Sequence, residues 1–354
     1  MEQANRQPDM LDLLTQPAFY AQNGRIVQVN QAAAQLGLEP GTDVTKLLST
    51  GADEYRTFQS GELSLSISVE NAPRGATVAR LREKDVFILE QPDTLGEFRA
   101  LSLAAQELRD PLSTIMTLSD RLFSALPENP ENTVADSLAQ FNQGLYKMLR
   151  LIGNMSYAEK FSKETAVYTE TCNIRTFFEE LCATSEKTVS SGGRTLQYRG
   201  LEKDLFCLIN QELLERAFYN LLSNAIKFSP QGATINVSLI RNQDKLYLTF
   251  ENPFDGISER NFFTAFRKEP GIFDGRCGMG LGMVLIRSAA CAHGGTVLAE
   301  QTDSQARVTF SLQINQNPSN SVRSPILRVD YAGERDHRLI ELADALPSEA
   351  YKDL

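Results

Sequence analysis

The N-terminal part of the chain alternates apolar and polar positions in short runs, a pattern that predicts strands. The strand-like runs lie at 17–20, 25–29, 63–69 and 86–89. Asn23-Gly24 stands between the first two runs, and this dipeptide is typical of a tight β-hairpin turn. Residues 30–36 predict a short polar helix that ends at Gly37. We therefore expect a small mixed α/β domain over residues 1–93.

Beyond this domain the pattern becomes helical, with apolar side chains at alternating spacings of four and three. The first seam comprises Leu101, Ala105, Leu108, Leu112, Ile115, Ser119, Leu122 and Leu126, and Ser119 is its one polar position. The second seam comprises Val134, Leu138, Phe141, Leu145, Met148, Ile152 and Met155. Pro127 and Pro130 separate the two helices. We expect an antiparallel helical hairpin over 94–165, and two copies would form a four-helix bundle, because one hairpin cannot cover both seams. The expected assembly is a homodimer.

Residues 213–230 predict an apolar helix with one narrow polar stripe. Asn220, Asn224 and Lys227 are spaced four and three residues apart, so they share one helix face. Such a stripe could be a solvated edge, but asparagine is a poor helix former and an unusual choice for that role. The two amides could instead bind a hydrated Mg²⁺ and polar atoms of a nucleotide, while Lys227 faces phosphate.

A glycine motif further along the chain supplies a second element. Gly278, Gly280 and Gly282 alternate with apolar residues and run into a helical pattern. Glycine lets the backbone approach a phosphate closely, and the start of a helix favours an anion. The motif alone also fits an ordinary turn, so its combination with the asparagine stripe is what indicates a nucleotide site.

Strand-like runs at 235–240 and 306–312 complete an α/β sandwich over residues 170–315. A tail follows over 316–354, and residues 335–347 carry apolar side chains at helical spacing. The tail could cap the protein or contact a partner. The overall expectation is an α+β multidomain protein.

Composition narrows the function classes. The chain has 354 residues, is 42% hydrophobic and carries a formal net charge of −10. This size allows two or three folded units, and the acidic balance argues against nucleic-acid binding. The sequence shows no signal peptide and no long apolar span, so we expect a cytoplasmic protein without membrane contact. Five cysteines form no C-x-x-C pair, which favours reduced, packed thiols.

Residues 104–112, A-A-Q-E-L-R-D-P-L, resemble the dimerisation helix of bacterial sensor histidine kinases, whose pattern is H-E-L-R-x-P-L. The asparagine stripe and glycine motif resemble the GHKL-type ATPase domain of the same family, and the element order of residues 1–93 resembles a PAS sensor domain. The resemblance implies ATP and Mg²⁺ as cofactors, with Asn224 as the metal contact. The cofactor-binding residues it implies are Asn220, Asn224, Lys227, Asn252, Gly256, Gly278, Gly280, Leu281 and Gly282.

Three further segments resemble the family pattern in part. Asn252 takes the place of the aspartate that accepts a hydrogen bond from the adenine amino group, so adenine binding should weaken modestly. Three aromatic residues, Phe262, Phe263 and Phe266, resemble the family's phenylalanine box, although they could equally be core. The stretch 267–277 would then be a short lid over the phosphates.

The dimerisation helix departs from the family at its reactive position. Gln106 stands where the family carries its phosphate acceptor histidine, and Asp110 replaces the usual Thr or Asn. An amide nitrogen is delocalised into its carbonyl and is a poor nucleophile, so Gln106 is not expected to act as acceptor, although Glu107 stays a candidate base. The chain is predicted to be a regulatory pseudokinase. The alternatives are a kinase acting in trans on a partner histidine kinase, or a phosphatase or binding module for a response regulator.

Overall fold

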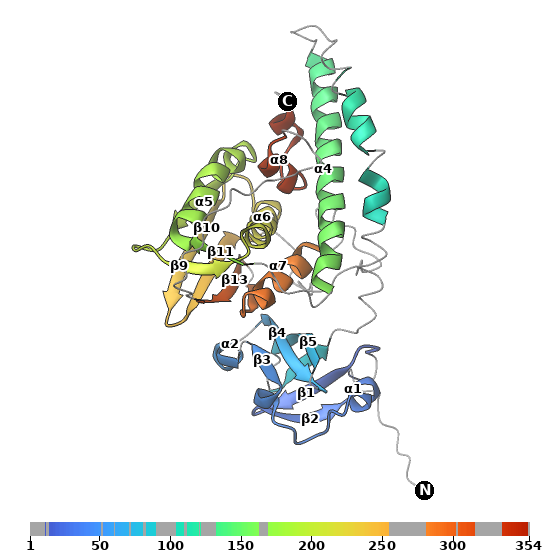
Figure 1. Cartoon of the computed structure of the whole chain (residues 1–354), viewed down its shortest axis with the longest axis vertical. Coiled ribbons are helices and arrows are strands. Elements are labelled where there is room, and N and C mark those ends of the chain that lie inside the picture. Colours follow the sequence, from blue (N-terminus) through green and yellow to red (C-terminus); the bar gives the residue numbers. More distant parts are fainter. Residues whose placement is uncertain are drawn as a thin grey trace.

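The computed structural model describes residues 11, 14–50, 52–59, 61–70, 72–80, 83–89, 104–109, 112–119, 121, 132–162, 169–254, 281–301, 304–315 and 335–352. Its N-terminal strands are β1 (Ala18–Gln22), β2 (Arg25–Val29), β3 (Leu48–Thr50), β4 (Gly61–Val69), β5 (Ala72–Arg80) and β6 (Asp85–Leu89). They are accompanied by α1 (Gln31–Gln35), η2 (Val44–Lys46) and α2 (Ala52–Thr57). A long helix, α4 (Asn132–Ser162), leads to the C-terminal part of the molecule (Figure 1).

The C-terminal part contains strands and helices in alternation. Its strands are β7 (Glu170–Asn173), β8 (Thr195–Arg199), β9 (Phe206–Ile209), β10 (Thr234–Asn242), β11 (Lys245–Pro253), β12 (Val297–Gln301) and β13 (Gln305–Gln313). Its helices are α5 (Ile174–Ser191), α6 (Gln211–Phe228), α7 (Leu281–Ala292), α8 (His337–Glu341) and η3 (Ser348–Tyr351). The strand runs predicted at 235–240 and 306–312 are confirmed within β10 and β13.

The predicted N-terminal hairpin is present as β1 and β2. Asn23 and Gly24 both have positive φ, at 51° and 75°, as the tight turn between right-twisted strands requires. Asn30 then caps α1, because its Oδ1 accepts hydrogen bonds from the backbone N–H groups of Ala33 and Ala18 at 2.9 and 3.0 Å. The same side chain ties the helix to the strand, so one asparagine fixes both elements.

The sequence pattern did not predict β5, which pairs with β4 along its whole length from Gly61↔Arg80 to Val69↔Ala72. Pro73 and Gly75 lower the strand propensity of this segment, because both residue types are depleted in strands, and the sequence pattern therefore did not indicate a strand here. The core that the sheet covers includes Phe19 and Phe87, whose stacked rings lie 4.6 Å apart between centroids.

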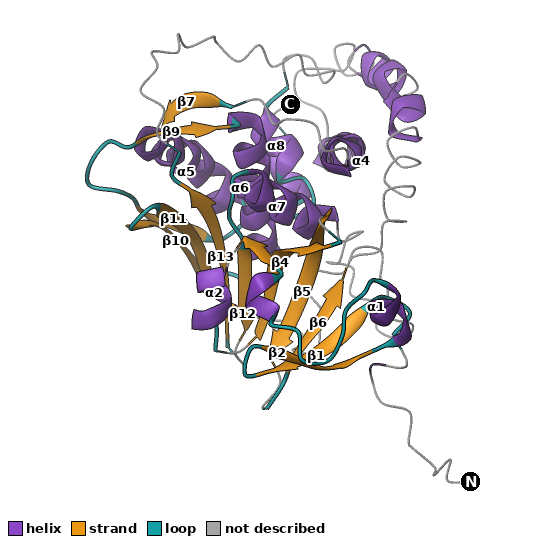
Figure 2. Ribbon diagram, turned by 60° about the horizontal axis from the view of Figure 1, so that its bottom comes forward, coloured by secondary structure: helices purple, strands orange, loops and turns teal. Residues whose placement is uncertain are grey.

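The C-terminal part is a sheet covered on one face by α5, α6 and α7 (Figure 2). Its strands run in the order β12-β13-β11-β10-β8, antiparallel except for the parallel pair β10 and β8. Side chains of β11 alternate between buried and half-buried, with Leu246, Leu248, Phe250 and Asn252 on the buried side. Phe250 packs against Phe218 of α6 with ring centroids 5.5 Å apart, so the helix carrying the asparagine stripe lies directly on the sheet.

The N-terminal and C-terminal strands belong to a single β-sheet. β4 of the N-terminal domain pairs antiparallel with β12, from Val297↔Ser64 to Ala299↔Glu62, which gives a continuous 11-stranded sheet. Lys245 Nζ reinforces the junction with an ion pair to Glu54 Oε1 at 2.8 Å, and both side chains are largely buried. The sequence pattern predicts residues 1–93 and 170–315 as separate units and carries no signal for this pairing.

Residues 104–109 and 112–119 are helical and run beside α4 (Figure 1). Arg109 donates to Ser156 Oγ of α4 at 2.9 Å. The sequence seams divide into two sets in the folded chain: Ala105, Leu112, Ser119, Leu145 and Ile152 are buried, while Leu108, Ile115, Val134, Phe141 and Met148 are 38–45% exposed. A continuous apolar stripe in the sequence is therefore covered only in part by the chain itself.

The C-terminal segment, residues 335–352, folds back onto α4, α5 and α6. It buries apolar side chains against them, namely Ile340, Leu342, Ala343, Leu346 and Tyr351. The helix α8 is shorter than the apolar pattern over 335–347 indicated, because the chain leaves the helix at Leu342 and continues in turns. Within the described ranges, none of the helices has the length and apolarity needed to span a bilayer.

Candidate functional site

Helix α6 positions the predicted asparagine stripe. The side chain of Asn210 caps the helix by accepting a hydrogen bond from the Leu213 N–H at 2.8 Å. Apolar residues on the remaining faces are buried against the sheet and α7, which fixes the rotation of the helix about its axis. Asn220, Asn224 and Lys227 consequently project from one side of α6.

Asn220 lies where α6 meets the start of α7. The side chain is 1% exposed, and its Nδ2 donates to the Arg216 carbonyl at 2.8 Å. A Cβ at Gly282 would lie 2.9 Å from Asn220 Oδ1. A side chain at position 282 would force Asn220 Oδ1 to shift, so the last glycine of the motif and the first asparagine of the stripe pack against each other.

Asn224 and Lys227 continue the stripe toward the end of the helix. Asn224 is half-buried, and its Nδ2 donates to Met283 Sδ of α7 at 3.3 Å. Sulfur is a weak acceptor, and an amide oxygen is a ligand that Mg²⁺ accepts. Lys227 Nζ lies 3.0 Å from Asp344 Oδ2 in the C-terminal segment. The donor set of the stripe thus fits a metal-bound nucleotide, with one amide held by the fold and one cation facing an anion.

The other predicted cofactor residues divide into two groups. Leu281 begins α7 and is buried, and Asn252 lies on the buried side of β11, where its Nδ2 donates to the Pro253 carbonyl at 2.9 Å. Phe254, two residues further, packs on Phe228 of α6. The remaining predictions, Gly256, Gly278, Gly280, the phenylalanine box and the lid at 267–277, lie outside the described residues.

Gln106 and Glu107 lie on the helix at residues 104–109, and both side chains are exposed. They follow Ala105, which is fully buried. Asp110, the other altered position of the dimerisation helix, lies outside the described residues.

The structure adds Arg150 of α4, which the sequence analysis missed. Its Nη1 donates to Ser223 Oγ at 2.9 Å, and its Nη2 donates to Asn220 Oδ1 at 3.3 Å. Nη1 also lies 3.3 Å from Asp344 Oδ2. The signal for Arg150 in the sequence is its place between Leu149 and Leu151. A charged side chain that is buried among apolar neighbours needs a polar partner.

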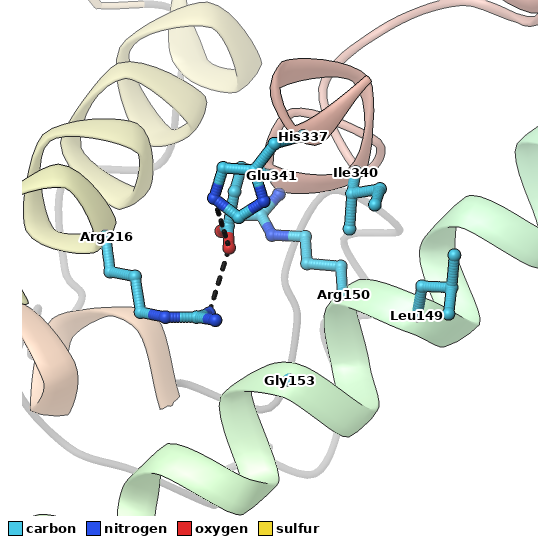
Figure 3. A pocket seen from close by; sticks show the side chains of 7 residues that line it. All are labelled: Leu149, Arg150, Gly153, Arg216, His337, Ile340 and Glu341. Atoms are coloured by element: carbon cyan, nitrogen blue, oxygen red, sulfur yellow. Dashed lines mark hydrogen bonds and ion pairs between the residues drawn. The ribbon is translucent and has the colours of Figure 1, made fainter. Parts of the chain in front are cut away.

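A small cavity adjoins this cluster between α4, α6 and α8 (Figure 3). Glu341 projects into it and pairs with Arg216 at 2.9 Å and with His337 at 3.7 Å. The cavity volume of about 10 Å³ is comparable to one water molecule. A nucleotide cannot enter here, so the cavity is a packing feature of the tail contact and not the cofactor site.

His293 links the end of α7 to the start of α6. Its Nδ1 lies 2.7 Å from the Ala289 carbonyl, and its Nε2 accepts a hydrogen bond from the Asn210 N–H at 3.0 Å. Nδ1 therefore carries the proton and the ring is neutral. Burial lowers the pKa of His293 below its ordinary value, although the Ala289 carbonyl opposes this shift.

Replacing His293 with alanine is expected to lower the free energy of unfolding by about 1–3 kcal/mol, because the partly buried Asn210 N–H loses its acceptor. The unfolded chain binds a proton at this histidine below a pH of about 6.5, and the folded chain does so only at lower pH. Wild-type stability should therefore fall as the pH drops from 6.5 through the lower folded pKa. Urea unfolding at several pH values checks this, and His337→Ala is the control that should keep the His293 slope. An unchanged slope in His293→Ala would contradict the assignment.

Comparison with known proteins identifies the class to which this fold and site belong. Residues 209–316 match the family described as histidine kinase-, DNA gyrase B- and HSP90-like ATPase. This range includes α6 and all the strands and helices from β10 to β13. Residues 209–316 of the C-terminal sandwich are therefore similar to ATPase domains of the GHKL class.

Relatives extend the similarity beyond this domain. The probable sensor protein PcoS of Escherichia coli is 27% identical over 312 residues, which cover 82% of this chain and 62% of that protein. The sensor histidine kinase WalK of Bacillus subtilis is 26% identical over 59% of this chain and 35% of its own length. The crystal structure of full-length ShkA in complex with AMPPNP shares the fold over 62% of this chain, at a TM-score of 0.51 and 15% identity. The chain is thus similar to bacterial sensor proteins over most of its length, and it spans less than two thirds of the length of these two relatives.

Proposed function

We propose that this chain is a histidine-kinase-like signal transduction protein that binds ATP with Mg²⁺ but does not phosphorylate itself. The observation that carries the proposal is the packing of α6 against the start of α7, where a Cβ at Gly282 would lie 2.9 Å from Asn220 Oδ1 of the polar stripe. Asn220 and Lys227 would bind polar atoms and phosphate of the nucleotide, and Asn224 would contact Mg²⁺. Bound Mg²⁺ would neutralise phosphate charge.

The absence of self-phosphorylation follows from Gln106. Its side chain is exposed on the helix at 104–109, so a partner domain could reach it, but its amide offers no nucleophilic nitrogen. Gln106 is thus as accessible as a phosphate acceptor has to be, but it lacks the nucleophilic nitrogen that an acceptor requires. The proposal is therefore a pseudokinase with an accessible but unreactive acceptor position. The proposed protein partners are a response regulator or a partner histidine kinase.

Purified chain incubated with [γ-³²P]ATP and Mg²⁺ tests this function, alone and with candidate partner kinases and receiver domains. We expect bound nucleotide and no acid-labile label on residues 94–165 of this chain. Acid-labile, base-stable label on that segment would contradict the pseudokinase proposal.

We further propose that the chain forms a homodimer through the exposed set of seam residues. Leu108 and Ile115 are seven residues apart, as are Val134, Phe141 and Met148, so each set returns to the same helix face. Both helices expose these positions at 38–45% although the sequence places large apolar groups there. A second copy that supplies the same two faces would complete the four-helix bundle.

The double substitution Phe141→Glu and Met148→Glu is expected to convert the dimer to a monomer, because it places four carboxylates in the apolar centre of the bundle. Light scattering coupled to size-exclusion chromatography measures the mass. Gln140→Glu, at an exposed neighbouring position on α4, is the matched control and should stay dimeric. A dimer that survives the double substitution would refute this interface.

A further inference from the structure

The polar stripe of α6 faces the chain's own C-terminal segment. Asp344 follows α8 in the turns at 342–346, and its carboxylate lies within ion-pair distance of two cations. Oδ2 is 3.0 Å from Lys227 Nζ and 3.3 Å from Arg150 Nη1. The side chains of Lys227 and Arg150 are only 10% and 4% exposed, whereas the Asp344 side chain is 36% exposed. Two largely buried cations therefore face a carboxylate that keeps a path to solvent.

Arg150 connects this cluster to the asparagine stripe. One guanidinium group reaches Asn220, Ser223 and Asp344 at once, through two of its nitrogens. Planar guanidinium groups suit phosphate oxygens as well as carboxylates, because both present paired acceptors. Arg150 and Lys227 therefore hold an anion next to the amide that the proposed nucleotide site uses.

The anion they hold is internal. Burial would raise the pKa of Asp344, but Arg150 and Lys227 outweigh burial and leave the pKa below its ordinary value. Asp344 is consequently ionised at neutral pH and presents a negative charge to the two cations. Lys147 of α4 adds a weaker attraction from the same side.

We propose that Arg150 and Lys227 form a phosphate-binding subsite of the nucleotide site, and that Asp344 occupies this subsite until a nucleotide phosphate displaces it. The proposal rests on the proposed ATP binding and adds to it a ligand group from α4 and an internal competitor. Asp344 Oδ2 already lies against both cations, so a phosphate can take the same position only after this carboxylate has left. Nucleotide binding and the docking of the tail are thus mutually exclusive.

The consequence is a measurable change in affinity. A site that is open for only a fraction of the time binds its ligand with an affinity reduced by that fraction. Asp344→Asn keeps the shape of the side chain and removes its charge, so the apolar contacts of the segment should hold the fold together. We expect this variant to bind ATP with Mg²⁺ about tenfold more tightly than wild type.

Isothermal titration of the full-length chain with ATP and Mg²⁺ tests the subsite. Glu349→Gln removes a carboxylate from an exposed position of the same segment and is the matched control, with an unchanged Kd. Adding Arg150→Met to Asp344→Asn should weaken binding again by about tenfold, because the phosphate loses a ligand. Equal Kd values for wild type and Asp344→Asn would overturn the proposal while leaving ATP binding intact. No binding by any of these proteins would contradict the proposed function itself.

Limited proteolysis of the wild-type chain gives an independent reading that needs no variant. Arg338 lies in α8, and cleavage after it requires the helix to unwind, which release of the segment from α4, α5 and α6 should favour. Saturating ATP with Mg²⁺ should accelerate cleavage after Arg338 several-fold, and adenosine, which has no phosphate, should not. Cleavage that is equally slow with saturating ATP would overturn the displacement mechanism.

Discussion

Asn224→Ala is expected to remove most of the stabilisation that ATP with Mg²⁺ gives to the wild-type chain. A ligand at one hundred times its dissociation constant stabilises a fold by about 2.7 kcal/mol, and loss of the metal contact should cancel most of this gain. The half-buried side chain makes only a weak contact to Met283 Sδ, so the variant should fold almost as stably as wild type without ligand.

The measurement is a thermal unfolding series with and without ATP and Mg²⁺. Asn236→Ala, on the exposed side of β10, is the control and should respond to the ligand as wild type does. If Asn224→Ala and wild type show the same shift in Tm with ligand, the metal contact does not lie at Asn224.

Gln106→His should change the chemistry most. The substitution puts an imidazole with a free lone pair beside Glu107, on an exposed helix surface, and Glu107 could serve as its base. We expect acid-labile, base-stable phosphate to appear on the segment 104–119 when ATP and Mg²⁺ are added. Wild type should stay unlabelled under the same conditions.

The assay is incubation with [γ-³²P]ATP followed by peptide mapping. Gln140→His introduces the same imidazole at an exposed position of α4 and is the matched control, which should take no label. An unlabelled Gln106→His chain that still binds ATP would mean that the loss of kinase activity does not reside at residue 106 alone.

Local chemistry decides which elements could be predicted from sequence. Asn23-Gly24 predicted the hairpin, because only residues that tolerate positive φ fit the turn between its strands. The heptad spacing of residues 134–155 predicted one long helix, and α4 confirms it. Its division into a buried and an exposed set could not be read from the chain, because both sets are equally apolar.

The features of the fold that could not be predicted depend on contacts between residues far apart in the sequence. The sequence of β4 does not indicate that it will pair with β12. Backbone groups make the hydrogen bonds between strands, so most side chains are compatible with the pairing and none specifies the partner. Glu54 and Lys245 also look like ordinary surface charges until the two sheets join and bury them.

The same distinction applies to the site. Asn220, Asn224 and Lys227 could be recognised because a helix brings residues four and three apart to one face. Arg150 and Asp344 join them only through tertiary packing of α4 and the C-terminal segment. The sequence therefore predicted the polar stripe on the helix, but not the two side chains that contact it in the folded chain.

Equilibrium binding of ATP to the full-length chain, with and without Mg²⁺, is the decisive measurement for the proposed nucleotide site. We expect saturable binding of one nucleotide per chain, tighter with Mg²⁺ than without it and weakened by Asn220→Ala. Absence of binding at millimolar ATP, in wild type and in Asp344→Asn alike, would contradict it.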